Sequence, residues 1–260
     1  MTAKSGSSTG RSANAPCPLA EMPPFRVLPA ELLDKLSAIS RRRNLERNAT
    51  LIDIGKSANV VGCVMKGVLR MSKTLVDGQQ QIVGLLVAGD IFGRVFDGDF
   101  PFSIEAATDC EICLFPKAEF EALMEHWPEL EKLVILGLLN ELDSAREWLG
   151  LVANHRTVEK VAGFLVFLHR RWAFLAEEEE QPGGTLIDLP IKRQDLALFL
   201  GTRPEAVSRA FHALHDKGHI RIVTPYRFLI VDFEALDRIS GQSVSQLDVH
   251  RALASGEGPR

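Results

Sequence analysis

The chain has 260 residues, of which 46% are hydrophobic and 25% charged, and its formal net charge is −4. This length suits two domains, and the acidic balance argues against a protein that coats nucleic acid regardless of sequence. No apolar run is long enough to span a membrane, and residues 1–16 lack the apolar core of a signal peptide. We therefore expect a cytoplasmic protein, with no membrane partner, whose cysteines are thiols.

The N-terminal half predicts a leader followed by a β-roll. Residues 1–24 are rich in Ser, Ala, Gly and Pro, which predicts a disordered leader. Leu28–Ile39 has the spacing of a short amphipathic helix. Short apolar runs separated by turn signals then follow, with Asp77-Gly78 as the clearest hairpin turn. We assign residues 25–127 to an antiparallel β-roll with its flanking helices.

Pro128 opens the longest predicted helix, which we assign to residues 128–155. Apolar residues recur along it at alternating spacings of three and four, as in a coiled-coil seam. These seam residues are Ile135, Leu138, Leu142, Ala145, Leu149 and Val152. A second apolar face carries Leu136, Leu139 and Trp148. We expect one face to pack on the roll and the other to join a second copy of the chain; a one-sided core helix is the alternative.

Residues 189–221 predict two helices joined by a tight turn at Gly201. Pro204 suits the first turn of the second helix. The buried stripes of the two helices are Leu196, Phe199 and Leu200, and then Val207, Phe211 and Leu214. Alternating residues 219–223 and 226–231 predict a β-hairpin wing, which favours a DNA-binding winged helix-turn-helix over an ordinary helical pair. This domain is assigned to residues 156–240 and a tail to residues 241–260.

The exposed face of the second helix carries side chains that can read base edges. Glu can accept from a cytosine amino group, Arg can reach guanine or phosphate, and Ser can contact either. The residues that we expect to contact double-stranded DNA are Glu205, Ser208, Arg209, Arg203, Thr202, Lys192 and Arg193. Cations outnumber acidic residues from residue 190 to 228, so the module is locally basic on an acidic protein.

The order of these parts resembles the CRP/FNR superfamily of bacterial transcription regulators, over about residues 25–240. Three motifs carry the resemblance: Val87–Gly93 in the roll, Asn140–Trp148 in the long helix, and Arg193–Ala197 with Glu205–Arg209 in the reader. It implies an α+β fold with an N-terminal β-roll of the cyclic-nucleotide-binding type, a dimerisation helix and a C-terminal winged helix-turn-helix.

The Glu-x-x-Ser-Arg pattern is similar to the FNR branch, including FixK-like members. This resemblance implies that Glu205, Ser208 and Arg209 read a TTGAT-N4-ATCAA-like palindrome. It also implies contact with RNA polymerase and control of low-oxygen, respiratory or redox-responsive genes. Arg203 stands where the family usually has Thr or Ser as the helix N-cap, which leaves the cap and the readout at the half-site edge open.

The resemblance offers three alternatives for the roll: a cyclic nucleotide, an iron–sulfur cluster or no small ligand. Where nucleotide-binding relatives place a Glu for the ribose and an Arg for the phosphate, this chain has Arg94 and residues 99–102, Asp-Phe-Pro-Phe. Phe and Pro offer a phosphate neither a cation nor donors, so we expect no cyclic nucleotide. Phe100 and Phe102 are interpreted as core residues.

Members of the FNR branch hold a [4Fe–4S] cluster on four cysteines, and Cys17 and Cys113 match two of those positions by resemblance. The leader has no second cysteine. Cys110 and Cys113 should point to opposite faces of one strand, which makes Cys110 a core thiol, and Cys63 is interpreted as a small packed apolar residue. We therefore disfavour an intact cluster.

The sequence thus favours a homodimeric regulator that needs no cluster, controlled by its abundance or by oxidation of Cys17 or Cys113. Two alternatives stay open: an oxygen sensor with an atypical cluster, and a redox or ligand-binding module whose helical pair is only an interaction surface. We find no Ser–His–Asp, metal-ligand or phosphate-loop pattern and do not expect an enzyme.

Overall fold

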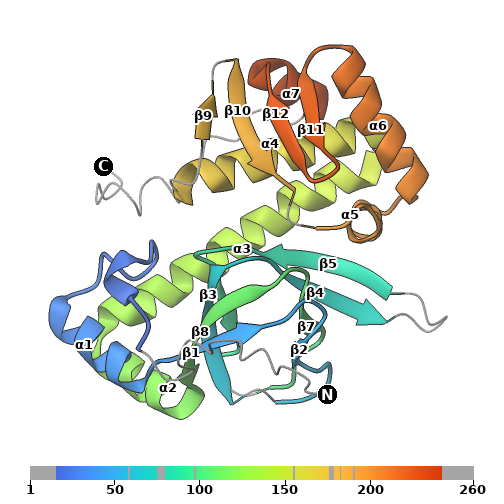
Figure 1. Cartoon of the computed structure of the whole chain (residues 1–260). Helices are drawn as coiled ribbons and strands as arrows, with labels where there is room; N and C mark the ends of the chain where they lie inside the picture. The colour runs from blue at the N-terminus through green and yellow to red at the C-terminus, as the bar shows by residue number, and fades with distance from the viewer. Residues whose placement is uncertain are drawn as a thin grey trace, which may run out of the picture.

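A computed structural model describes residues 16–241, except for residues 58, 75–79, 97, 155, 176–178, 182 and 190. In Figure 1 the roll lies below and the C-terminal domain above, and helix α3 (Pro128–Asn154) runs between them. No helix in these residues is long and apolar enough to cross a membrane.

Eight strands of the described chain form the roll and pair into two antiparallel sheets. One sheet has the order β1 (Arg41–Leu45), β8 (Cys110–Pro116), β3 (Val60–Lys66) and β6 (Ile91–Gly93). The other has the order β2 (Thr50–Ile52), β7 (Ser103–Ala106), β4 (Leu69–Thr74) and β5 (Gln80–Leu86). Strands β4 and β5 pair as the predicted hairpin requires, and its turn, Asp77-Gly78, lies outside the described residues.

Strand alternation sends the side chains of β8 into two separate cores. Cys110 and Ile112 point into the roll core, between the two sheets. Cys113 and Phe115 point into a second cluster, here called the helical core, which lies between the first sheet and helices α1 (Ala30–Ile39), α2 (Lys117–His126) and the start of α3. The predicted opposite orientation of Cys110 and Cys113 is confirmed.

Residues 16–24 correct the predicted disordered leader. They include a short 3-10 helix, η1 (Leu19–Glu21), and bury Cys17, Leu19 and Met22 in the helical core beside Phe25. The prediction of disorder was wrong here because it rested on the overall composition of the segment. Burial of these apolar side chains offsets the conformational entropy that the segment loses on folding. Residues 1–15 lie outside the described residues.

Helix α3 matches the predicted long helix, and its first turns pack on the roll through Leu130, Leu133 and Val134. The predicted seam lies on another side: Leu138 is 59% and Leu149 68% exposed, Ile135, Leu142 and Ala145 are also exposed, and Val152 is half-buried. In the predicted second face, Leu139 is exposed and Leu136 is half-buried, and the side chain of Trp148 lies outside the described residues. The roll therefore packs on earlier turns of α3 than predicted. This leaves an apolar row on α3 uncovered in the single chain.

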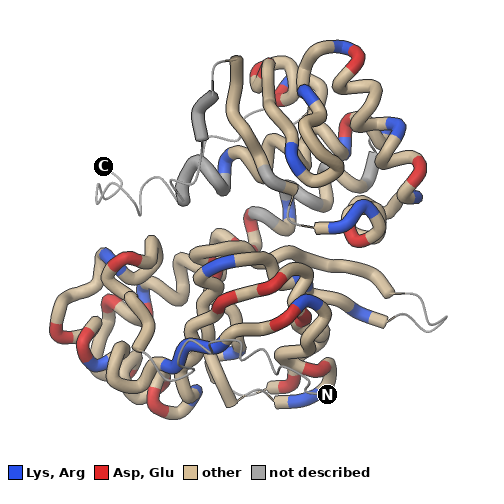
Figure 2. The backbone as a smooth tube through the Cα atoms, in the orientation of Figure 1, with Lys and Arg blue, Asp and Glu red and all other residues tan. Residues whose placement is uncertain are grey.

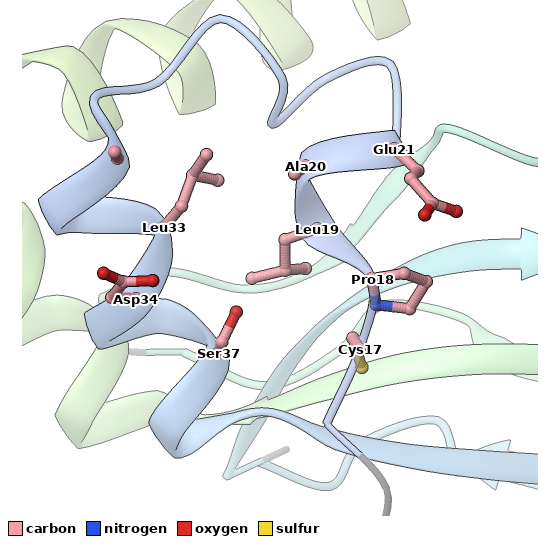
Figure 3. A pocket seen from close by; sticks show the side chains of 9 residues that line it. Cys17, Pro18, Leu19, Ala20, Glu21, Leu33, Asp34 and Ser37 are labelled. Atoms are coloured by element: carbon pink, nitrogen blue, oxygen red, sulfur yellow. The ribbon is translucent and has the colours of Figure 1, made fainter.

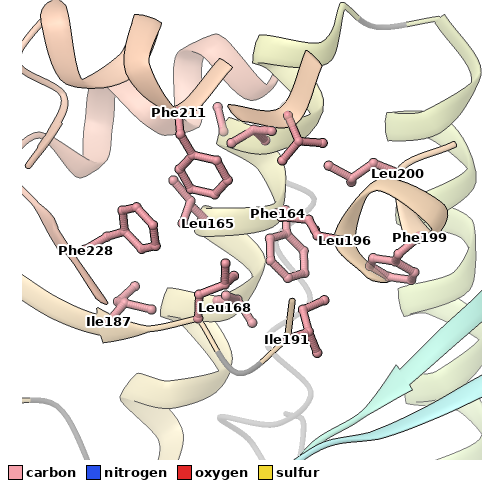
Figure 4. Close-up of a cluster of buried hydrophobic side chains, with 14 of the residues drawn as sticks. Phe164, Leu165, Leu168, Ile187, Ile191, Leu196, Phe199, Leu200, Phe211 and Phe228 are labelled. Carbon is pink, nitrogen blue, oxygen red and sulfur yellow. The ribbon is translucent and has the colours of Figure 1, made fainter. Parts of the chain in front are cut away.

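The C-terminal domain contains α4 (Thr157–Leu175), α5 (Arg193–Phe199), α6 (Pro204–Asp216) and α7 (Phe233–Ser240). Its sheet has the order β11 (Ile220–Thr224), β12 (Arg227–Ile230), β10 (Gly184–Asp188) and β9 (Glu179–Gln181). The predicted wing is the β11–β12 hairpin. Figure 4 shows the core that joins α4, α5 and α6 through Phe164, Leu196 and Phe211. Residues 242–260 of the predicted tail lie outside the described residues.

Candidate nucleic-acid interface and sensor sites

Helices α5 and α6 form a helix-turn-helix around Gly201. This glycine has φ +60°, in the left-handed region that L side chains rarely adopt, and so permits the tight turn predicted from the sequence. The Thr202 N–H donates to Ala197 O at 2.9 Å, which folds the turn back onto α5. Both predicted apolar stripes are buried, so α6 is held by one face and free on the other.

The free face of α6 presents the expected base-reading residues. Glu205 and Arg209 are exposed, and Ser208 is half-buried. Ser208 and Arg209 follow Glu205 by three and four residues, so all three lie on one side of the helix. His212 continues the row, with Nδ1 2.8 Å from Ser208 O. Arg203 at the start of α6 is also exposed. Figure 2 marks Lys and Arg positions on α5, on α6 and on the neighbouring strand β11.

Two of the residues expected to contact DNA, Arg193 and Thr202, are half-buried against other side chains, whereas Lys192 is exposed. The guanidinium carbon of Arg193 lies 3.5 Å from the Phe211 ring centroid and 5.0 Å from that of Phe228, and burial lowers the pKa of Arg193 to about 10. The Thr202 hydroxyl lies 3.4 Å from that of Thr157 on α4. Lys192, at the N-cap of α5, is exposed. Arg193 and Thr202 are thus half-buried and contact other side chains of the C-terminal domain.

The N-terminus of α6 lacks a side-chain cap, which answers the question that the sequence left open. Arg203 occupies the N-cap with φ −101° and ψ 146°, and its side chain makes no capping hydrogen bond. Pro204 follows at the first helical position, where its missing N–H leaves no intrahelical bond unmade. The helix is thus started by proline and not by a side-chain cap.

At the position where nucleotide-binding relatives hold the phosphate, the roll presents apolar side chains. Phe100 is buried in the roll core, as predicted. Phe102 is half-buried against that core, and the two ring centroids lie 6.2 Å apart with the rings edge-on. Arg94 Nη1 donates to Asp99 O at 3.1 Å. A buried phosphate needs a cation and paired donors. These residues do not fit one in the manner of nucleotide-binding relatives.

The cysteines are arranged as one disulfide and two buried thiols. Cys17 and Cys113 are bonded, across 96 residues of sequence. Cys63 faces Cys113 across β3 and β8, whereas Cys110 lies in the roll core, so both are packed as predicted. Burial raises the pKa of Cys63 well above its ordinary value and also raises that of Cys110.

This arrangement does not fit a four-cysteine cluster. Among the described residues, no group of three or more His, Cys, Asp or Glu side chains could hold a metal ion. Cys110 points away from the other three cysteines. Sequence reasoning identified Cys17 and Cys113 by position but missed that they bond, because no local pattern relates residues so far apart.

Comparison with known proteins finds a matching family model for each of the two domains. A model of the cyclic nucleotide-binding domain matches residues 42–126, and one of the Crp-like helix-turn-helix domain matches residues 159–239. A probable transcriptional activator of Rhizobium leguminosarum bv. viciae is 36% identical over 207 residues, which cover 80% of this chain and 84% of that protein. The transcriptional activator protein FnrL of Cereibacter sphaeroides is 32% identical over 220 residues, covering 85% and 88%.

The solved structure of FixK2 from Bradyrhizobium japonicum has the same fold, with a TM-score of 0.71 and 23% identity over 79% of this chain and 100% of that one. The predicted fold class and family are thereby confirmed. The chain belongs to the CRP/FNR family, in its FNR/FixK branch, and is a transcription regulator with a helix-turn-helix DNA-binding domain.

Proposed function

We propose that the protein reads a TTGAT-N4-ATCAA-like palindrome through Glu205, Ser208 and Arg209. The observation that carries this proposal is the free face of α6, where these three side chains lie together opposite a fully buried stripe. In a helix-turn-helix this second helix enters the major groove. There Glu can pair with cytosine and Arg can pair bidentately with guanine, while Lys192 and Arg203 can contact phosphates.

The acting form is a homodimer. The uncovered apolar row of α3 supports it, because exposed apolar patches of this kind mark interaction surfaces. Pairing two α3 helices by a twofold axis presents two α6 helices to DNA, which matches a palindromic site. The relatives named as transcriptional activators support contact with RNA polymerase, and membership of the FNR/FixK branch supports, by the resemblance stated above, control of low-oxygen or redox-responsive genes.

DNA binding in this proposal requires neither a cyclic nucleotide nor an iron–sulfur cluster. Phe100 fills the core at the phosphate position, and the cysteines do not gather as four ligands. Aerobically purified, metal-free protein is therefore expected to bind the palindrome. Binding only after anaerobic reconstitution with iron and sulfide would reject this part.

The test is fluorescence anisotropy of the full chain on the palindrome and on a scrambled duplex, across a series of salt concentrations. Glu205→Ala and Arg209→Ala should each cost about 1–3 kcal/mol on the palindrome and much less on the scrambled duplex. The control, Lys192→Ala, should weaken both duplexes alike, because phosphates carry no base sequence. Unchanged discrimination in both α6 variants would contradict base reading.

A further inference from the structure

The disulfide is a covalent link between the described part of the leader and strand β8 of the roll. Cys17 bonds to Cys113 in β8, and the Cys17 N–H donates to Ser40 Oγ at 3.0 Å. The remaining anchors of the leader are apolar: Leu19, Met22 and Phe25 in the helical core. The bond therefore decides whether the first described residues are covalently fixed or are held by apolar packing and hydrogen bonds only.

The same core contains the beginning of the dimerisation helix. Leu130, Leu133 and Val134 of α3 lie in one apolar cluster with Cys17 and Cys113. The uncovered row of α3 starts next along the helix, at Ile135. A packing change in the helical core would thus act on the first turns of the helix that pairs in the proposed dimer.

One of the two disulfide residues, Cys17, lines a surface hollow. Cys17, Pro18 and Leu19 form one wall, and Leu33 and Ser37 of α1 form the other, as Figure 3 shows. Cys113 is fully buried in the sheet. A small thiol that enters the hollow therefore lies nearer to Cys17, which is 4% exposed, than to Cys113.

The neighbouring thiol does not compete for this exchange. Cys63 lies opposite Cys113, but burial raises its pKa well above the ordinary value, so it holds almost no thiolate, the reactive form. Cys110 lies in the other core. Cys17 and Cys113 can thus exchange two electrons as one pair, without a third cysteine taking part.

We propose that Cys17 and Cys113 are a reversible redox couple that exchanges with thiols and disulfides of the glutathione class, and that the disulfide favours the DNA-binding dimer. In reduction, a glutathione thiolate attacks Cys17 Sγ, forming a mixed disulfide, and the Cys113 sulfur leaves and takes up a proton. A second glutathione thiolate attacks the glutathione sulfur of the mixed disulfide, releasing the Cys17 thiol and oxidised glutathione. Oxidised glutathione drives the reverse reaction.

The couple is tested by counting thiols, independently of DNA. The full chain is equilibrated in glutathione buffers of graded redox ratio, quenched in acid, unfolded and labelled with a maleimide polymer that shifts its gel mobility. Two labels are expected under oxidising and four under reducing conditions, in one step. Cys63→Ser and Cys110→Ser should lose one label throughout but keep the step, whereas Cys17→Ser should abolish it. Four labels at every ratio would overturn the proposal.

The effect on the dimer, which rests on the proposed function, is measured on the wild-type chain in the two end buffers. Reduction should weaken palindrome binding about tenfold, within the usual range of coupling between two sites, and lower the dimer fraction in sedimentation velocity. Cys17→Ser should stay at the reduced value in both buffers. Equal binding by the two forms would overturn the regulatory part. If neither form binds the palindrome, the proposed function fails. The thiol count then still shows whether Cys17 and Cys113 form a reversible couple, and sedimentation velocity still shows whether the disulfide affects the dimer.

Discussion

Arg70 on β4 of the roll forms an ion pair with Asp195 on α5 of the DNA-binding domain, with Nη1 3.2 Å from Oδ1. The same guanidinium donates through Nε and Nη2 to Glu105 Oε2, at 3.0 and 2.8 Å. The Arg70 and Asp195 side chains are only 13% and 15% exposed. Ile82 and Leu85 of β5 lie in the same apolar cluster as the C-terminal domain. Glu105 thus orients an arginine that links the roll to the helix-turn-helix.

This link predicts a measurable loss of stability in Asp195→Ala. The substitution leaves a largely buried guanidinium with one partner fewer, so we expect the free energy of unfolding in urea to fall by about 1.5–3 kcal/mol. Asp143→Ala is the control, because its partner Arg146 is 67% exposed and such surface pairs contribute about 0–1 kcal/mol. Equal losses in the two variants would show that the buried pair does not stabilise the fold.

The pair also shows what could be predicted from sequence. The apolar stripe of α5 and the turn at Gly201 are local patterns, and both were predicted because spacing along one helix reports which face is buried. Arg70 and Asp195 are 125 residues apart, as is typical of contacts that only tertiary packing creates. Arg193 illustrates the same limit: its motif placed it on α5, but not over the rings of Phe211 and Phe228.

The uncapped start of α6 predicts that Arg203→Thr is stabilising. Arg203 already has the extended backbone of an N-cap, and a Thr hydroxyl there can accept from the Glu205 N–H, so we expect a gain of about 1 kcal/mol in urea unfolding. Arg203→Ala removes the same charge without supplying a cap and should give no gain. If both variants are equally stable, capping does not limit this helix.

The position of Arg193 predicts that it contributes no phosphate contact. Arg193→Met should leave the salt dependence of DNA binding unchanged, and its stability should change by only about 1 kcal/mol, because cation–π attraction and the cost of burying the charge oppose each other. Lys192→Met, at the exposed neighbour, should lower the logarithmic salt slope by about 1. A slope lowered by Arg193→Met would place its guanidinium on the DNA backbone instead.

The exposed row of α3 predicts that Leu138→Glu produces monomers. Leu138 is 59% exposed in the single chain, so the variant should fold normally but bring like charges together in a paired seam. Sedimentation velocity should show the monomer, and palindrome affinity should fall with it. Asp143→Ala, exposed on the same helix outside the seam, should remain dimeric. A dimeric Leu138→Glu protein would locate the interface elsewhere.

Burial of Cys63 predicts a loss of stability at alkaline pH. The pKa of Cys63 is raised well above its ordinary value of 9.0 in the folded chain, first by burial and then by the charge of Asp90. Above that ordinary value the unfolded chain releases the thiol proton while the folded chain keeps it. The unfolded state then binds fewer protons, so the free energy of unfolding falls as pH rises, by up to about 1.4 kcal/mol per pH unit for this thiol.

The measurement compares urea unfolding from pH 8 to pH 10 with and without Cys63→Ala, in a Cys17→Ser, Cys113→Ser background that has no disulfide to exchange. Cys110 contributes to both proteins alike, so the difference in slope isolates Cys63. Cys63→Ala should be less stable at pH 8, because it leaves a small cavity, yet lose stability more slowly as pH rises. Parallel slopes would mean that the Cys63 thiol ionises as readily in the folded chain as in the unfolded one, and it would then be a competing nucleophile beside Cys113.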